Sequence, residues 1–306
     1  MRKGKRVFAL GFFDGVHLGH QALLRECVTL AERLDCNTAA ITFDRHPKAL
    51  FMPDPPPLLS TATTRKQLLR SYGIHQIYQY PVVEEVMSMP WEAFLQELVE
   101  YGAVGFVCGH DFRFGNRGEG NAENLQSFCK EQNLPCIIVP EQTVDGLRVS
   151  STLIRGLIEK GCMETAVRYL GHPHLIAGPV VHGKQIGRTL GIPTANLVLE
   201  PGQAVPRFGV YACRCLVDGK AYAAVTNVGT RPTVSGIGVT VEPWILDFSG
   251  DLYDQEIVLE FHRFLRPETK FDGLPALQAQ IRKDADTTRA YFQAEALLPH
   301  ETDPTY

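Results

Sequence analysis

The chain has 306 residues, of which 44% are hydrophobic and 21% charged, and its formal net charge is −4. These values are ordinary for a globular enzyme of about two domains, and they argue against a nucleic-acid binder held by bulk positive charge. The apolar run after the basic first residues ends at Gly11, which is too short for a signal peptide or a membrane span. We therefore expect a cytoplasmic protein with neither nucleic-acid nor membrane partners; the sequence leaves its oligomeric state open.

The cysteines are spread along the chain, and no two of them form a CxxC pair. This spacing is not that of a zinc site, so we expect buried, reduced thiols, consistent with a reducing cytoplasm. Cys213 and Cys215 are two apart, and a strand would carry both on one face.

The first half of the chain alternates short apolar runs with segments whose apolar residues recur at helical spacing. We predict strands at residues 6–10, 36–43, 76–80, 103–108 and 136–139, and helices at 20–34, 63–72, 91–101 and 121–132. Such alternation predicts a Rossmann-like α/β domain, in which helices cover both faces of a parallel sheet. A helix, a turn and a second helix are predicted over residues 152–170.

Beyond residue 175, short β-rich runs punctuated by Gly and Pro replace this pattern. We predict strands at residues 176–181, 210–217, 221–228, 240–248 and 256–264, followed by a helix at 274–293. This pattern is typical of a small antiparallel β-barrel, with the C-terminal helix packed on it. The expected domains are residues 1–172 and 173–306.

The turn after the first strand carries the sequence GFFDGVHLGH, residues 11–20. A strand, a glycine-rich turn and a helix together direct backbone N–H groups and the positive end of the helix dipole at one point, which favours a phosphate. His17 and His20 are three apart at the helix start and face one side, so both imidazoles can donate to phosphate oxygens during an in-line displacement. Gly19 lets a nucleotide approach the backbone closely. A structural or metal-binding histidine pair is the alternative interpretation.

As a whole, residues 11–20 resemble the ATP site of the HxGH nucleotidyltransferase superfamily, in the GxFDGxHxGH form of its FAD synthetase branch. This resemblance implies adenylyl transfer, with His17 and His20 as catalytic residues. The residues that it places against ATP in this turn are Gly11, Phe12, Gly15 and Gly19.

Residues 42–47, TFDRHP, resemble the family's TFxPHP segment at the flavin site, although Arg45 stands where proline is usual. The resemblance implies that Phe43, His46 and Pro47 bind flavin. Phe43 is able to stack on an isoalloxazine ring, and a plain core role is its alternative.

Two later segments resemble further parts of the same site. Residues 109–115, GHDFRFG, are similar to a loop in which Asp111 takes the family's Asn-or-Asp position near ATP and the metal, and a hard oxygen ligand suits Mg²⁺. Residues 148–155, RVSSTLIR, resemble the ISSTxIR motif, although Ser and Thr there are also ordinary helix caps. The ATP-phosphate residues implied by this motif are Arg148, Ser150, Ser151, Thr152 and Arg155.

A second site is predicted in the barrel half. Residues 178–197 carry three regularly spaced glycines and then Pro-Thr-Ala-Asn, and they resemble the riboflavin kinase signature. The resemblance implies that Gly183, Gly187 and Arg188 contact ATP, and that Thr194 and Asn196 are Mg²⁺ ligands. Thr194 and Asn196 are two apart, so an extended segment directs both the same way.

Residues 240–248, TVEPWILDF, place Glu242 on the family's catalytic glutamate. A carboxylate beside a primary hydroxyl can accept its proton as the oxygen attacks a γ-phosphate; an outward-facing strand residue is the alternative. Pro243 and Trp244 replace the usual small residue and histidine, and proline predicts an edge strand or a bulge. Asp254 stands where the family tends to have glycine. For Arg266 and Arg282, the sequence allows either a role at the flavin or a structural role.

The resemblance covers residues 7–292, and the chain is similar to the bacterial bifunctional riboflavin kinase/FAD synthetases. It implies phosphorylation of riboflavin to FMN, then adenylylation of FMN to FAD with release of pyrophosphate. The implied partners are the small molecules riboflavin, FMN and ATP, with Mg²⁺ as cofactor. A transferase for another phosphorylated acceptor and a non-catalytic flavin carrier are the alternatives.

Overall fold

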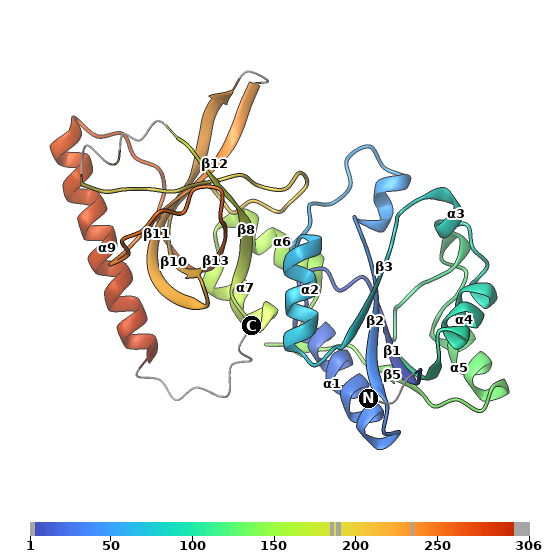
Figure 1. The fold of residues 1–306 in the computed structure, drawn as a ribbon. Helices are drawn as coiled ribbons and strands as arrows, with labels where there is room; N and C mark the ends of the chain where they lie inside the picture. Colours follow the sequence, from blue (N-terminus) through green and yellow to red (C-terminus); the bar gives the residue numbers. More distant parts are fainter. Residues whose placement is uncertain (1–3, 184–186, 188–190, 234–235, 297–306) are drawn as a thin grey trace. The chain divides into compact units, whose positions relative to one another are not determined.

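The computed structural model of the chain describes residues 4–183, 187, 191–233 and 236–296 (Figure 1). These residues form two compact units, which divide between Ser151 and Thr152.

The first unit is built on a five-stranded sheet of order β3-β2-β1-β4-β5, and every neighbouring pair in it is parallel. The strands are β1 (Arg6–Leu10), β2 (Asn37–Phe43), β3 (Gln76–Tyr80), β4 (Ala103–Gly109) and β5 (Cys136–Val139). The helices are α1 (Leu18–Arg33), α2 (Ala62–Ser71), α3 (Glu84–Met87), α4 (Trp91–Glu100) and α5 (Ala122–Glu131). Short elements complete the unit: η1 (Pro47–Leu50), η2 (Asn116–Gly118), β6 (Thr143–Val144) and β7 (Leu147–Arg148). The predicted parallel α/β domain is confirmed.

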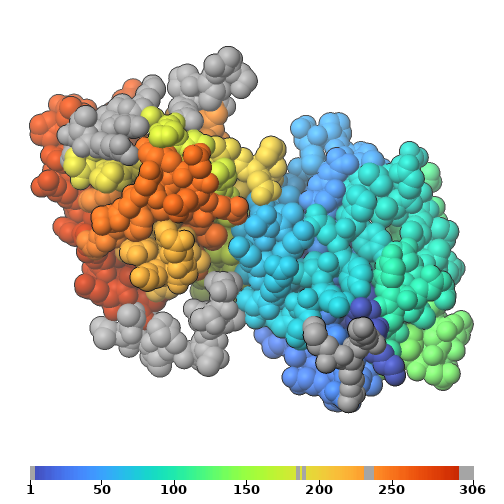
Figure 2. All heavy atoms as spheres, in the orientation of Figure 1, coloured from blue at the N-terminus to red at the C-terminus, as the bar shows by residue number. Residues whose placement is uncertain are grey.

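Burial explains why the central strands are continuous apolar runs. Residues 7–10 of β1 are fully buried, because helices cover both faces of a parallel sheet. On one face, Phe8 and Phe106 pack with residues of α4 and α5. In the space-filling view, the segment from α2 to α4 forms much of this unit's visible surface (Figure 2).

Successive strands are added on opposite sides of β1, and this change of side positions the predicted ATP site. From β1 the chain adds β2 and β3 on one side and then β4 and β5 on the other. The carboxyl ends of β1 and β4 therefore flank a topological switch point, where open α/β sheets bind ligands. Residues 11–20, here called the histidine turn, follow β1, and the loop with Asp111 follows β4.

The second unit contains a closed antiparallel barrel of order β10-β11-β12-β9-β8-β13. Its strands are β8 (His174–Val181), β9 (Asn196–Leu197), β10 (Gly209–Val217), β11 (Lys220–Thr233), β12 (Gly236–Ile245) and β13 (Glu256–Arg266). Its helices are α6 (Ser151–Lys160), whose first residue precedes the division, α7 (Met163–Leu170) and α9 (Leu274–Ala296). The predicted barrel and C-terminal helix are confirmed.

Two features of the barrel differ from the prediction. The two-residue strand β9 was not predicted, because a run so short shows no alternation; it closes the barrel between β12 and β8. Strands β11 and β12 pair from Ala224–Ile245 out to Thr233–Gly236, well past the predicted end of the first strand at residue 228, so their hairpin is longer than its apolar pattern.

Helices α6 and α7 pack in the unit that carries the barrel, with α7 against β8 and β13. Tyr169 and Leu170 of α7 are buried, and Arg207 N–H donates to the Ile158 carbonyl of α6 at 3.2 Å. The domain boundary at residues 172 and 173 stays a prediction about where the two functional domains meet.

All the cysteines are free thiols, as expected, and Cys213 and Cys215 are both buried on β10. Three cysteines differ from the expectation of burial: Cys36 and Cys136 are only partly buried, and Cys162 is exposed at the N-terminal end of α7. Within the residues described, no helix combines the length and apolar character needed to cross a membrane.

Candidate functional sites

The turn between β1 and α1 is held in an unusual backbone conformation. Phe13, Gly15 and Val16 have φ values of 59°, 78° and 38°. The left-handed region disfavours a β-branched residue, yet Val16 is fully buried there, so the packing around it holds the strained turn in place. At Gly19, a Cβ atom would lie 3.2 Å from the His17 ring, so glycine allows the close approach that the turn requires.

The two histidines of the turn stack on one another. Their ring centroids are 3.7 Å apart, with 13° between the planes. His17 caps α1, because its Nδ1 accepts from the His20 backbone N–H at 3.4 Å. A neutral ring that accepts at Nδ1 carries its proton on Nε2, so His17 presents an Nε2–H donor.

His20 has a pKa well below its ordinary value of 6.5, because burial disfavours the imidazolium and the neighbouring His17 and Arg65 add to this effect. The His20 ring is therefore neutral at physiological pH. Its Nδ1 atom is buried, with no hydrogen-bond partner among the described residues. The predicted pair is thus a pair of hydrogen-bond donors and acceptors rather than two fixed charges.

Arg65 is a residue at this site that the sequence analysis missed. It lies on α2 and is fully buried, its guanidinium carbon lies 4.7 Å from the Phe12 ring centroid, and it donates to the Phe43 carbonyl. The signal for it was weak: an arginine on the same helix face as Thr64, Leu68 and Leu69, which are also buried. It brings a permanent positive charge to the histidine turn.

A cavity of about 360 Å³, here called the sheet cavity, adjoins the turn. Phe12, Phe43, Pro47 and Asp111 all line it, so the structure brings one predicted ATP residue, two predicted flavin residues and the predicted metal ligand together. His46 caps η1 and meets the Phe12 ring edge-on at 5.3 Å. The size suits a small-molecule ligand. Other lining residues, which the sequence analysis did not single out, include Tyr80, Met87, Phe94 and Phe112.

The predicted metal ligand and one predicted ATP residue form an ion pair. Arg148 donates to the Asp111 carboxylate, and its Nε lies 3.3 Å from Glu141 Oε2. All three side chains are about half exposed, so the pairing is weak and easily exchanged.

The remaining predicted ATP residues of the first site follow β7. Ser151 Oγ donates to the Asp14 carbonyl at 3.1 Å, which connects it to the histidine turn. Ser150 is half-buried beside it. Thr152 and Arg155 lie on α6 in the second unit, so their contact with ATP at this turn stays a prediction.

In the barrel, strand β12 contributes side chains to two cavities, and Glu242 lines one of them. Glu242 pairs with Asn227, Pro243 with Thr226, and Trp244 with Val225. Because side chains alternate along a strand, Glu242 and Trp244 line one cavity of about 350 Å³, the barrel cavity. Pro243 and Ile245 line a second one of about 100 Å³, the side cavity.

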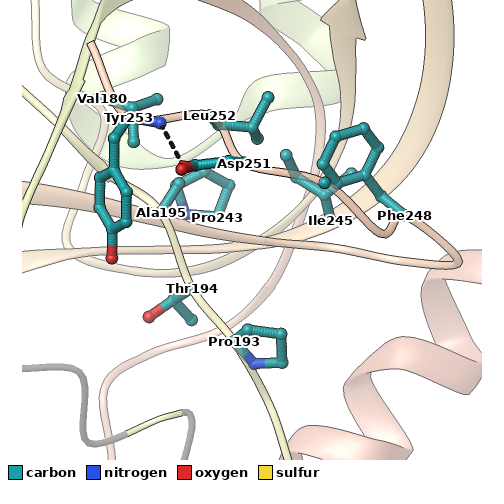
Figure 3. A pocket seen from close by; sticks show the side chains of 11 residues that line it. Val180, Pro193, Thr194, Ala195, Pro243, Ile245, Phe248, Asp251, Leu252 and Tyr253 are labelled. Atoms are coloured by element: carbon teal, nitrogen blue, oxygen red, sulfur yellow. Dashed lines mark hydrogen bonds between the residues drawn. The ribbon is translucent and has the colours of Figure 1, made fainter. Parts of the chain in front are cut away.

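Figure 3 shows the side cavity, with Thr194, Pro243 and Tyr253 at its walls. The Tyr253 N–H donates to Asp251 Oδ1 at 3.0 Å, and the Tyr253 ring stacks on His182 with centroids 3.6 Å apart. Thr194 lines both cavities, so it lies where a ligand in one would meet a ligand in the other.

Two residues that replace the family's usual ones fit the local backbone. Pro243 lies beyond the single Val241–Leu197 pair of β12 with β9, so its missing N–H breaks no ladder bond, and its carbonyl accepts from Ala195 N–H at 2.9 Å. Asp254 has a φ of 61°, the left-handed conformation that glycine adopts freely and aspartate tolerates.

The predicted phosphate and metal residues of the barrel lie close to one another. A Cβ atom on Gly183 would lie 2.3 Å from the Asn196 amide nitrogen, so Asn196 packs directly on that glycine. Gly187 lines the barrel cavity with Thr194. Arg188 lies outside the described residues. No cluster of three or more His, Cys, Asp or Glu side chains occurs in the part of the chain that the structure describes. The hydroxyl of Thr194 and the amide of Asn196 fit Mg²⁺, which takes few protein oxygens when phosphates supply others.

Arg266 joins the barrel to α9. Its Nη2 lies 2.8 Å from Asp284 Oδ2 and its Nε 3.0 Å from the same oxygen, while Gln280 donates to Asp284 Oδ1 at 2.9 Å. Arg266 also lines the barrel cavity and lies over the Phe271 ring. Its ion pair with Asp284 gives it a structural role, and its flavin-side role stays a prediction, whereas Arg282 is exposed on α9.

Comparison with known proteins matches a different family model to each half of the chain. A family model for FAD synthetase matches residues 1–153, and one for riboflavin kinase matches residues 170–292. The bifunctional riboflavin kinase/FMN adenylyltransferase of Listeria monocytogenes is 34% identical over 291 residues, covering 94% of this chain and 92% of the relative. Its counterpart in Escherichia coli K12 is 35% identical over 290 residues, covering 94% and 92%.

A solved structure from Streptococcus pneumoniae, described as a macrolide-efflux protein, is 31% identical, covers 94% of this chain and 95% of its own, and superposes with a TM-score of 0.84. Together with two site-bearing units in the order expected, these matches show that the chain belongs to the bifunctional riboflavin kinase/FMN adenylyltransferase family, transferases that phosphorylate riboflavin to FMN and then adenylylate FMN to FAD.

Proposed function

We propose that the two reactions occur at two separate sites, adenylyl transfer at the His17–His20 turn and phosphorylation at Glu242 in the barrel. One observation carries this assignment: each unit has its own cavity, and each cavity is lined by residues predicted for that unit's reaction. The proposed partners are riboflavin, FMN and ATP with Mg²⁺, in the cytoplasm, with neither nucleic acid nor membrane.

In the first site, the nucleophile is a phosphate oxygen of FMN, which is already an anion at neutral pH and needs no general base. It attacks the α-phosphorus of ATP, an O–P bond forms, and the bond to pyrophosphate breaks. The Nε2–H of His17 and the neutral ring of His20 align the phosphates, while Arg148, Ser150 and Ser151 hold the departing pyrophosphate. Mg²⁺ held by Asp111 would neutralise phosphate charge.

FMN binds in the sheet cavity in this account. Phe43 and Pro47 offer apolar surface for the isoalloxazine, and Phe12 connects that surface to the histidine turn. Arg65, buried behind Phe12 and Phe43, fixes both of them and adds positive charge near the reacting phosphates.

In the second site, the nucleophile is the neutral terminal hydroxyl of riboflavin. Glu242 accepts its proton as the oxygen attacks the γ-phosphorus of ATP, and ADP leaves. Riboflavin occupies the barrel cavity and the nucleotide enters from the side cavity, so the two substrates meet at Thr194. Thr194 and Asn196 would hold Mg²⁺ against the phosphates, with Gly183, Gly187 and Arg188 around ATP.

One assay tests this assignment: the purified chain, riboflavin and Mg-ATP, with the flavins separated chromatographically over time. We expect FMN to appear first and FAD to follow. Formation of FAD from added FMN but not from riboflavin would overturn the kinase assignment. Unchanged riboflavin and FMN together with tight flavin binding would indicate a flavin carrier.

A further inference from the structure

Trp244 lies two residues after Glu242 on β12, and both side chains line the barrel cavity. In the sequence, this tryptophan stands where the family usually has histidine. Trp244 therefore lies on the same face of β12 as the proposed base and about 7 Å from it along the strand.

The indole packs on neighbouring apolar side chains. Trp244 is half-buried and packs against a hydrophobic cluster of Val210, Val225, Leu246 and Ala285, drawn from β10, β11, the turn after β12 and α9. A ring fixed in this way loses little conformational freedom when a ligand stacks on it, which is why rigid aromatic side chains make effective contact surfaces.

The barrel cavity changes character along β12. At Glu242 its lining is polar, because Asn227 pairs with Glu242 and the Glu268 carboxylate lies next to Asn227 beside Gly229. At Trp244 the wall is apolar, because Val225 pairs with Trp244 and Val210 packs in the same cluster. Phe271, Leu277 and Ile281 also line this cavity. A ligand with a polyhydroxyl chain at one end and a flat ring system at the other fits this gradient, and an extended ribityl chain covers roughly the 7 Å between the two positions on β12.

We propose that Trp244 is the residue that seats the isoalloxazine ring of riboflavin, and so sets the distance at which the terminal hydroxyl reaches Glu242. This inference rests on the proposed riboflavin site in the barrel. Trp244 is a positioning and specificity residue: it makes the kinase select a polyol that carries a flat ring over one that does not.

A spectroscopic experiment tests the contact. The chain has only two tryptophans, and Trp91 lies in the first unit against the Phe114 ring. In a Trp91→Phe protein, all indole signal comes from Trp244. Titration with riboflavin should quench this fluorescence saturably and produce the broad long-wavelength absorption of an indole stacked on an oxidised flavin. That absorption should be absent from the Trp91→Phe/Trp244→Phe protein. Saturable riboflavin binding of equal strength with no such absorption in either protein would overturn the stacking.

Kinetics supply the second readout. Trp244→Leu should raise the KM for riboflavin about 10-fold or more, as expected from the loss of one ring-stacking contact, and Trp244→Phe should raise it less. The KM for ATP should stay unchanged in both. The matched control is Leu246→Val, because Leu246 belongs to the same buried cluster but does not line the cavity. An equal rise of the riboflavin KM in Leu246→Val would mean that Trp244 acts only through packing.

Glu242→Gln separates failure of this inference from failure of the site. If Glu242→Gln abolishes phosphorylation while Trp244→Leu leaves the riboflavin KM unchanged, the site stands and the inference is wrong. If Glu242→Gln also phosphorylates at the wild-type rate, riboflavin does not react in the barrel cavity and both fail.

Discussion

The two units place their reactive side chains on different kinds of backbone. In the first, His17 and His20 lie in a strained turn at the carboxyl edge of a parallel sheet, where a helix N-terminus is available to phosphates. In the second, Glu242 lies within a barrel strand, in register with Asn227 on the next strand. The first site is thus formed by loops that meet at one edge of the sheet. In the second, the alternation of side chains along one strand directs Glu242 into the cavity.

The chemistry of the two nucleophiles gives a reason for this difference. An anionic phosphate needs alignment and compensation of charge, which neutral imidazoles, backbone N–H groups and arginines provide. A neutral hydroxyl needs a group that takes its proton, and a carboxylate on a rigid strand provides that at a defined distance. If the two sites are separate, a substitution in one should leave the reaction of the other intact.

Glu242→Gln should lower riboflavin phosphorylation by about 100- to 10,000-fold, the range for loss of a general base, because the amide cannot accept the proton. Conversion of added FMN to FAD should persist. The measurement is initial rates of FMN and FAD formation by chromatography. Glu256→Gln is the matched control, since Glu256 is an exposed glutamate at the start of β13. Loss of both reactions in Glu242→Gln would contradict separate sites.

His20→Ala should lower FAD formation from FMN by about 100- to 1000-fold, the usual effect of removing one positioned donor, and should leave FMN formation intact. The pH profile adds a second test. Because burial and neighbouring charges lower the pKa of His20 well below 6.5, the wild-type rate should show no step from this residue between pH 6.5 and 8. A full loss of rate as the pH rises through 6.5 would show that the imidazolium is needed instead.

Asp111→Ala should raise the Mg²⁺ concentration needed for FAD formation without changing that for FMN formation. Asp111→Asn keeps one oxygen ligand and should have a smaller effect, although it removes the charge partner of Arg148. Magnesium titrations of both reactions measure this difference. An equal change in both Mg²⁺ requirements would show that Asp111 does not serve the first site alone. Chelation of the metal should stop both reactions.

The smallest expected effect concerns the stability of the barrel unit. His262 is buried, with its Nε2 3.5 Å from Glu260 Oε2 and its Nδ1 3.4 Å from Glu295 Oε1. Burial lowers the pKa of His262, but the hydrogen bonds and charges of Glu260 and Glu295 outweigh it and raise the pKa above 6.5. Folding therefore favours the protonated ring. This stabilisation is complete below pH 6.5 and is lost as the pH rises through the folded pKa.

The unfolding temperature of the barrel unit should accordingly fall as the pH rises above 6.5, by about 4 °C for each kcal/mol lost, and His262→Gln should remove that slope. Differential scanning calorimetry across this pH range measures it. His174→Gln is the control, because burial lowers the pKa of His174 to about 4 and keeps it neutral over the whole range. An unchanged slope in His262→Gln would show that other groups cause the pH dependence.

The sequence predicted most of the fold because strong periodicity marks both the parallel strands and the longer barrel strands. It could not predict β9, whose two residues carry no pattern, nor the pairing of Asp111 with Arg148, which depends on two loops meeting. Arg65 was missed because a buried cation on an apolar helix face contradicts the rule that charges stay outside. The effect of Pro243 could be judged only from the structure, since it depends on where the pairing with β9 ends.

The claim that two independent sites share the chain has a direct test, which is to mix the two single-site variants. His20→Ala alone should convert riboflavin to FMN and stop there, and Glu242→Gln alone should leave riboflavin unchanged. Equal amounts of both, given riboflavin and Mg-ATP, should form FMN and then FAD, because FMN released by one protein serves the other. A mixture that forms no FAD, although each variant keeps its remaining activity, would contradict the account.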